Sequence, residues 1–95
     1  MNTITSGSEK QNAWATDIRD AWLAKCDAII ERQQPGSERQ QRAQAMRDFV
    51  ASVDDARLLI DTRRHFSYLR DAGVRRGWIT REASLDFYSL TQYGF

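Results

Sequence analysis

The sequence is poor in the residues that build catalytic and metal sites. Its 95 residues include one cysteine, Cys26, and one histidine, His65, which lie far apart in the chain. A structural zinc site needs four Cys or His ligands, and a Cys–His nucleophile pair needs hydrogen-bond contact and an orienting third group. No local signature of either surrounds these residues. We therefore expect no catalytic residue, no metal ligand and no cofactor, and we predict that the chain is not an enzyme.

Loops that bind calcium or phosphate are also missing from the sequence. Asp54-Asp55 lacks the alternating oxygen ligands of a calcium loop. The glycines in Gly73-Val74-Arg75-Arg76-Gly77 are not followed by the Lys-Ser/Thr ending that a phosphate-cradling loop requires. Binding of a ligand would therefore have to use a surface that the fold assembles.

Turn-forming residues are scarce, with one proline and five glycines. A turn-rich β-protein would need more of both, whereas the abundant Ala, Arg, Gln, Asp and Leu favour helices. Because 41% of the residues are hydrophobic, the chain can bury a core and is not expected to be disordered. The composition predicts an all-α protein.

Long apolar runs are absent as well. No stretch approaches the roughly 20 apolar residues that span a bilayer, and the first residues lack the pattern of a secretion signal. We expect a cytoplasmic protein that does not bind a membrane. Cys26 lies on the apolar side of a predicted helix, so we interpret it as a small buried hydrophobe rather than a reactive thiol.

The first predicted helix begins at Ser6-Gly7-Ser8-Glu9, which has the form of a capping box. Apolar residues then recur at three- and four-residue steps over about six turns. We expect Trp14 and Trp22 to lie in the core. The whole stripe is Trp14, Ile18, Trp22, Cys26 and Ile29/Ile30.

A second helix follows after a short break. Gln33-Gln34-Pro35-Gly36 interrupts the periodicity, because proline cannot continue the helical hydrogen-bond ladder. Ser37-Glu38-Arg39-Gln40 is a second capping box. Since the connection is short, the two helices are expected to form an antiparallel hairpin. The predicted core stripe of the second helix is Ala43, Met46, Phe49, Val50 and Val53.

The remaining helices are predicted from caps. Asp54 is taken as the cap of a third helix over residues 55–72, which Gly73 would end in the left-handed conformation. Thr80 is expected to cap a last short helix. The inward residues would be Ala56, Leu59, Ile60, Phe66 and Leu69 in the third helix, and Ala83, Phe87, Tyr88 and Leu90 in the last.

Together these patterns predict one helical domain over residues 1–95, a compact bundle of four to five helices. The first two helices would form the hairpin and the third would pack across them. Residues 1–5 would be a frayed tail. Tyr93 and Phe95 are expected to pack onto the domain or onto a partner.

Charge is spread unevenly along the chain. Residues 57–81 carry seven Arg and two Asp, a balance of +5, although the whole chain has a net charge of only +1. Such asymmetry indicates a binding face. Arg forks bind phosphate and carboxylate, and Arg, Tyr and Trp are enriched at binding hot spots. The candidate binding residues are Arg63, Arg64, Tyr68, Arg70, Arg75, Arg76 and Trp78. The alternative is a solvated face whose arginines pair with nearby acids.

Residues 7–19 and 56–63 carry two motifs, and these resemble the motifs of a family of short, uncharacterised helical proteins of bacteria, phages and plasmids. The first has the family's Gly-Ser-Glu-Lys-Gln, two residues, then Trp-Ala and Ile-Arg, over residues 7–19. The second is residues 56–63, where Leu58-Leu59 stands in place of the aromatic pair of the family and Thr62 in place of Asn. The resemblance implies a mobile-element setting, in which small helical proteins include anti-CRISPR inhibitors of host defence. It transfers no site residue.

We therefore predict a non-enzymatic protein–protein interaction module, acting as a phage or mobile-element inhibitor of a bacterial defence complex in the anti-CRISPR manner. The alternative is a small nucleic-acid-binding or regulatory protein that uses the arginine-rich face on phosphates. A pI near 7.9 argues against that alternative, because nucleic-acid-binding domains usually exceed about 9. A homo-oligomeric structural module is the third possibility.

Overall fold

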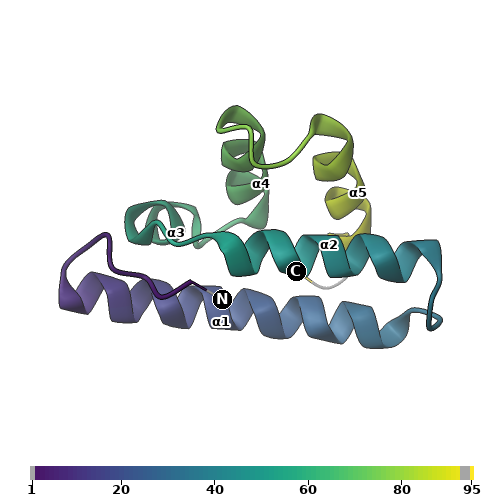
Figure 1. Ribbon diagram of the computed structural model, residues 1–95, viewed down its shortest axis with the longest axis horizontal. Coiled ribbons are helices and arrows are strands. Elements are labelled where there is room, and N and C mark those ends of the chain that lie inside the picture. The colour runs from purple at the N-terminus through teal and green to yellow at the C-terminus, as the bar shows by residue number, and fades with distance from the viewer. Residues whose placement is uncertain (1, 93–94) are drawn as a thin grey trace.

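The computed structural model describes residues 2–92 and 95, and in these residues it contains five α-helices and no strand (Figure 1). The all-α class predicted from the sequence is confirmed. No helix in this part of the chain has both the length and the apolar character needed to cross a bilayer. The helices are α1 (Glu9–Arg32), α2 (Glu38–Ser52), α3 (Ala56–Thr62), α4 (Phe66–Arg75) and α5 (Arg81–Thr91).

Helices α1 and α2 form the predicted antiparallel hairpin, which runs the length of the molecule in Figure 1. The chain reverses through Gly36, whose φ of 76° is left-handed. The Ser37 hydroxyl then accepts a hydrogen bond from the Gln40 N–H at 3.1 Å, so Ser37 caps α2 as expected. Local turn and capping chemistry therefore place this hairpin.

The start of α1 differs from the prediction by two residues. Ser8, not Ser6, is the N-cap, and it exchanges hydrogen bonds with Gln11 in a reciprocal capping box. Ser6 instead ties two distant segments together, because its hydroxyl accepts from the Ala56 N–H and donates to the Asp54 carbonyl. The prediction of a frayed tail over residues 1–5 is also wrong at Ile4, which is 4% exposed and belongs to the core.

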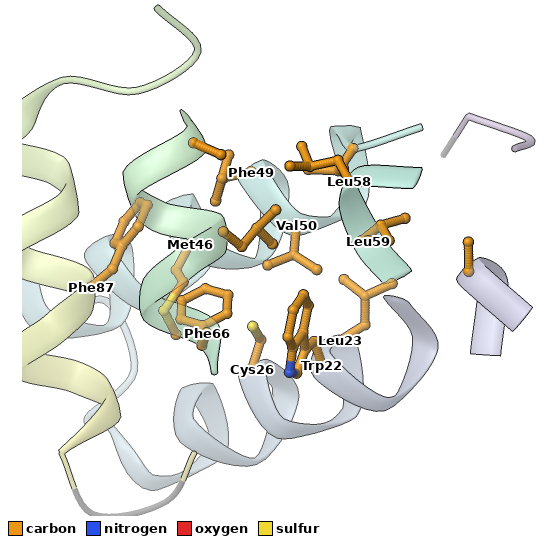
Figure 2. Close-up of a cluster of buried hydrophobic side chains, with 14 of the residues drawn as sticks. Trp22, Leu23, Cys26, Met46, Phe49, Val50, Leu58, Leu59, Phe66 and Phe87 are labelled. Carbon is orange, nitrogen blue, oxygen red and sulfur yellow. The ribbon is translucent and has the colours of Figure 1, made fainter. Parts of the chain in front are cut away.

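The core lies where the α1–α2 hairpin meets the other three helices (Figure 2). The predicted α2 stripe is confirmed in full, whereas the predicted α1 stripe holds only in part. Trp22 is buried and meets the Phe66 ring edge-on, with 5.4 Å between ring centroids. Trp14 is 45% exposed, so the prediction that it lies in the core is wrong.

The predicted third helix over residues 55–72 is in fact two helices. Asp55, not Asp54, caps α3 by accepting from the Leu58 N–H at 3.1 Å. The chain leaves the helix after Thr62, and His65 is extended with a φ of −141°. The break turns the chain so that α3 packs on α1 while α4 stands over the core and delivers Phe66 to Trp22. Tertiary packing therefore overrides local helix propensity here.

Glycine does end α4, but at Gly77 rather than at Gly73 as predicted. The Trp78 N–H donates to the Gly73 carbonyl at 2.8 Å and the Gly77 N–H to the Val74 carbonyl at 3.1 Å, with Gly77 at a φ of 75°. This pattern is a Schellman motif. Gly73 lies inside α4, where an added Cβ would come within 2.9 Å of two atoms of the Phe49 ring.

Helices α4 and α5 form a second, shorter pair (Figure 1). Thr80 caps α5 as predicted, accepting from the Ala83 N–H at 3.0 Å. Both helices stand out from the α1–α2 hairpin in Figure 1, and the link over residues 76–80 joins them at the far end. Phe87 and Leu90 of α5 are buried as expected, but Tyr88 is exposed. Phe95 packs on Phe66, as expected, and Tyr93 lies outside the described residues.

Candidate cationic and aromatic surfaces

The predicted arginine face is divided between the two ends of α4. Arg63 and Arg64 precede the first turn of α4, in which Tyr68 lies, whereas Arg75, Arg76 and Trp78 lie at its last turn and beyond. A helix of ten residues spans about 15 Å, so the two groups form separate surfaces. We call the depression at the start of α4 the base depression and the one between α4 and α5 the apex cleft.

Arg70 does not belong to an exposed face, because it is only 9% exposed. Its Nη1 donates to the Ser84 carbonyl at 3.0 Å, and its guanidinium lies over the Tyr88 ring, 5.3 Å from the centroid. The arginine therefore joins α4 to α5. Its Nε–H is buried and has no hydrogen-bond acceptor among the described residues. Arg70 lines both the base depression and the apex cleft.

Two further predicted arginines are held by aromatic rings. The Arg63 guanidinium lies 4.9 Å from the centroid of Trp14 and donates to the Ile60 carbonyl. Arg76 lies 5.1 Å from the centroid of Trp78 and pairs with the Asp55 carboxylate at 3.0 Å. Stacking of this kind fixes the orientation of an arginine at a small cost in side-chain entropy.

The pKa of Asp55 responds to this ion pair. Partial burial opposes ionisation of the carboxyl, but hydrogen bonds from the Leu58 N–H and from Arg76 outweigh it and lower the pKa of Asp55. The carboxylate therefore links the α3 N-terminus to the end of α4. Arg76 thus has a structural role as the partner of Asp55.

The base depression has a volume of about 240 Å³ and lies where α1, the α3–α4 turn, α4 and the end of α5 meet. Its charged side chains are all cations, and none of them forms an ion pair among the described residues. They are Lys25, Arg63, Arg64 and Arg70, with His65 beside them. Phe95, the last residue of the sequence, also lines it, and the Lys25 ammonium lies 5.6 Å from the centroid of the Phe95 ring. Tyr68 is next to this group, since its ring meets His65 edge-on at 5.2 Å.

The apex cleft has a volume of about 340 Å³ and is lined by both charged and apolar side chains. Arg75 and Arg81 are exposed there and form no ion pair within the described residues. Leu85 is 62% exposed, and Asp71 adds one carboxylate to the lining. Trp78, in the adjoining link, is 44% exposed.

Several lining residues of these two surfaces were not among the candidates selected from the sequence. They include Lys25, Arg81, Leu85 and Tyr88. For Leu85 a signal existed, because it lies two residues before Phe87 and therefore about 200° around an ideal helix from that buried ring. An apolar residue on the polar side of an amphipathic helix indicates exposed apolar surface.

Cys26 is fully buried, as predicted. Burial, reinforced by the neighbouring Asp27 carboxylate, raises the pKa of the Cys26 thiol to about 12. The group is therefore protonated near neutral pH, which makes it a poor nucleophile.

The two segments that resemble the mobile-element family lie together in the fold. Gly7 is so close to Ala56 that an added Cβ would approach the alanine Cβ to 3.3 Å, and Ser8 and Gln11 form the α1 capping box. Trp14 of the first segment stacks with Arg63 of the second. These motif residues thus have structural roles at the start of α1. In the comparisons with known proteins, no family model, curated protein or solved structure matches the chain.

Proposed function

We propose that the chain is a non-enzymatic protein-binding module that docks on an acidic protein surface through the apex of the α4–α5 pair. The docking surface comprises Arg75, Trp78, Arg81 and Leu85. One observation carries the proposal: the exposed Leu85 lines the apex cleft together with Arg75 and Arg81, which have no carboxylate partner among the described residues. The exposed Trp78 lies in the adjoining link.

A protein surface fits this composition better than a nucleic-acid backbone does. Interface centres are enriched in Trp and Arg, and their fully buried part is more apolar than the rest of the surface. Phosphates would gain nothing from Leu85 and would be repelled by Asp71, which also lines the apex cleft. The motif resemblance implies a mobile-element setting, so a bacterial defence complex, such as a CRISPR effector, is the first class of partner to test.

The test is an affinity pull-down from bacterial lysate, with and without nuclease, using the charge reversal Arg75→Glu/Arg81→Glu. The matched control is Arg32→Glu/Arg39→Glu, which also reverses two exposed arginines that form no ion pair in the described part of the chain, one in a last helical turn and one in a first turn. Both variants therefore place one glutamate near a helix C-terminus and one near a helix N-terminus, so the helix dipoles affect them in the same way.

The proposal predicts that one discrete protein resists nuclease, is lost with Arg75→Glu/Arg81→Glu and is kept with the control. Recovery of nucleic acid alone would replace it with the nucleic-acid-binding alternative. Equal loss with both variants would show that net charge, rather than the apex, governs the binding.

A further inference from the structure

The base depression and the apex cleft meet at Arg70, which lines both of them. Together they form one seam between α4 and α5, and we call it the α4–α5 seam. Its floor is the Arg70 side chain, which is held by the Ser84 carbonyl and covered by the Tyr88 ring. Its walls are Ser67, Asp71 and Val74 of α4 and Arg81, Leu85 and Tyr88 of α5.

The wall residues follow helical spacing on each helix. They recur after four and then three residues, so each set lies along one side of its helix. The opposite sides are packed, because Leu69 of α4 and Phe87 of α5 belong to the core. On the seam side, Leu85 and Tyr88 are 62% and 51% exposed. The seam is therefore an accessible surface lined by two helices, about three turns or 15 Å long.

The apex end of the seam defines the charge of its occupant. Arg75 and Arg81 are exposed there, and neither forms an ion pair within residues 2–92 and 95. Val74 and Leu85 supply apolar surface beside them, and Asp71 adds a carboxylate. The two arginines outnumber this carboxylate, so a segment with an apolar stripe and acidic residues at its apex end is complementary to the seam.

We infer that the α4–α5 seam receives one amphipathic α-helix of the partner protein, with acidic residues at the end that meets Arg75 and Arg81. This inference rests on the proposed function, because it specifies the segment by which the partner docks. A helix satisfies its own backbone hydrogen bonds, whereas an extended segment pairs its backbone with a sheet edge, and the interior of a helix has no such edge. A third helix can also lay its side chains into the groove between two helices.

The experiment is photo-crosslinking in bacterial cells from two positions on α5, followed by mass spectrometry of the crosslinked partner residues. The crosslinker p-benzoylphenylalanine replaces Leu85 in one variant and Gln92 in the other. These positions share one side of α5 and lie about 10.5 Å apart along it, because Gln92 keeps helical dihedral angles. Both side chains are exposed, so both variants should fold, and unchanged thermal melting would verify this. The control carries the crosslinker at Ala24, which is exposed on α1.

We expect both positions to crosslink to one segment of one protein, at residues about seven apart, because each residue of a helix advances about 1.5 Å. Apolar residues should recur in that segment at steps of three and four, with acids beside the residue that meets position 85.

Crosslinked residues about three apart would indicate an extended segment, which advances about 3.3 Å per residue. That result would overturn the inference and leave the proposed function intact, as would crosslinks to separate segments or a product from position 85 alone. Absence of a protein product from both positions, or the same products from the Ala24 control, would contradict the proposed function and this inference with it.

Discussion

The two helix pairs of this protein contain the same kinds of side chain in different surroundings. In the α1–α2 hairpin, arginines find acids nearby: Arg42 pairs with Glu38, and Arg47 lies 2.6 Å from the Asp27 carboxylate. In the α4–α5 pair, Arg75 and Arg81 form no ion pair among the described residues, and large apolar side chains face solvent.

Arg32 and Arg39 of the hairpin are also exposed without an ion pair among the described residues, so unpaired arginines alone do not distinguish the two pairs. The comparison teaches that, in the described part of the chain, only in the α4–α5 pair do such arginines line a cleft together with an exposed leucine.

The largest expected effect is a loss of stability from a substitution in the core of the α1–α2 hairpin. Met46 of α2 has no exposed surface, so Met46→Ala should lower the free energy of unfolding by about 3 kcal/mol through lost burial and a cavity. Leu85→Ala on α5 should change it by less than about 0.5 kcal/mol, since Leu85 is already in solvent. Urea denaturation measures both. A comparable cost at Leu85 would show that the exposed leucine supports the fold.

A smaller effect tests how closely Gly73 of α4 packs against Phe49 of α2. Gly73→Ala forces a Cβ against the Phe49 ring and Ile79, both within 3.1 Å of it. The overpacking should exceed the helix-propensity gain of alanine and leave a net loss of about 1–2 kcal/mol.

The control for this substitution is Gly36→Ala, where φ is 76° but nothing lies within 4 Å. It should cost only the backbone strain, about 1 kcal/mol, by thermal melting. If Gly73→Ala instead stabilises the protein, α4 is not held tightly against Phe49.

The Asp55–Arg76 link between α3 and the end of α4 gives a pH-dependent prediction. Because the pKa of Asp55 is lowered in the folded state, its contribution is complete above its ordinary pKa of 3.8 and is lost as the pH falls through the lowered value. Asp55→Asn keeps an N-cap but removes the charge, so it should cost about 0.5–1 kcal/mol near pH 7.

The gap in the free energy of unfolding between wild type and Asp55→Asn should be constant above pH 3.8 and should narrow as the pH falls below it, toward the lowered pKa of Asp55 in the folded state. Denaturation curves over the range from pH 7 to pH 2.5 would measure it. A gap that does not vary with pH would mean that the charge of Asp55 contributes nothing.

The smallest effect concerns the contact between the two motif segments. A double-mutant cycle on Trp14→Ala and Arg63→Ala should give a coupling free energy of about 0.5–1 kcal/mol, the range for an exposed cation–π pair. Zero coupling in denaturant unfolding would show that Trp14 and Arg63 do not stabilise each other. Trp14 would then be a candidate contact for a binding protein.

Features set by neighbouring residues could be predicted from the sequence. The break at Pro35-Gly36 and the caps at Ser37 and Thr80 depend on hydrogen bonds and dihedral angles within a few positions, and the α2 stripe follows helical periodicity. The pairing of α1 with α2 followed from the short connection between them.

Features set by distant contacts could not be predicted. The turn between α3 and α4 brings Phe66 onto Trp22, and the Ser6 hydroxyl accepts from the Ala56 N–H instead of capping α1. The candidate site shows the same division. The run of arginines was visible in the sequence, but the burial of Arg70 under Tyr88 and Ser84 depends on how α5 returns along α4.

The measurement that tests the central claim most directly is photo-crosslinking in bacterial cells, with Leu85→p-benzoylphenylalanine on α5. The matched control carries the same residue at Ala24, which is exposed on α1. We predict that position 85 crosslinks to one discrete protein and that position 24 does not. The same products from both positions, or nucleic acid alone from position 85, would contradict the assignment of the α4–α5 pair as the protein-docking element.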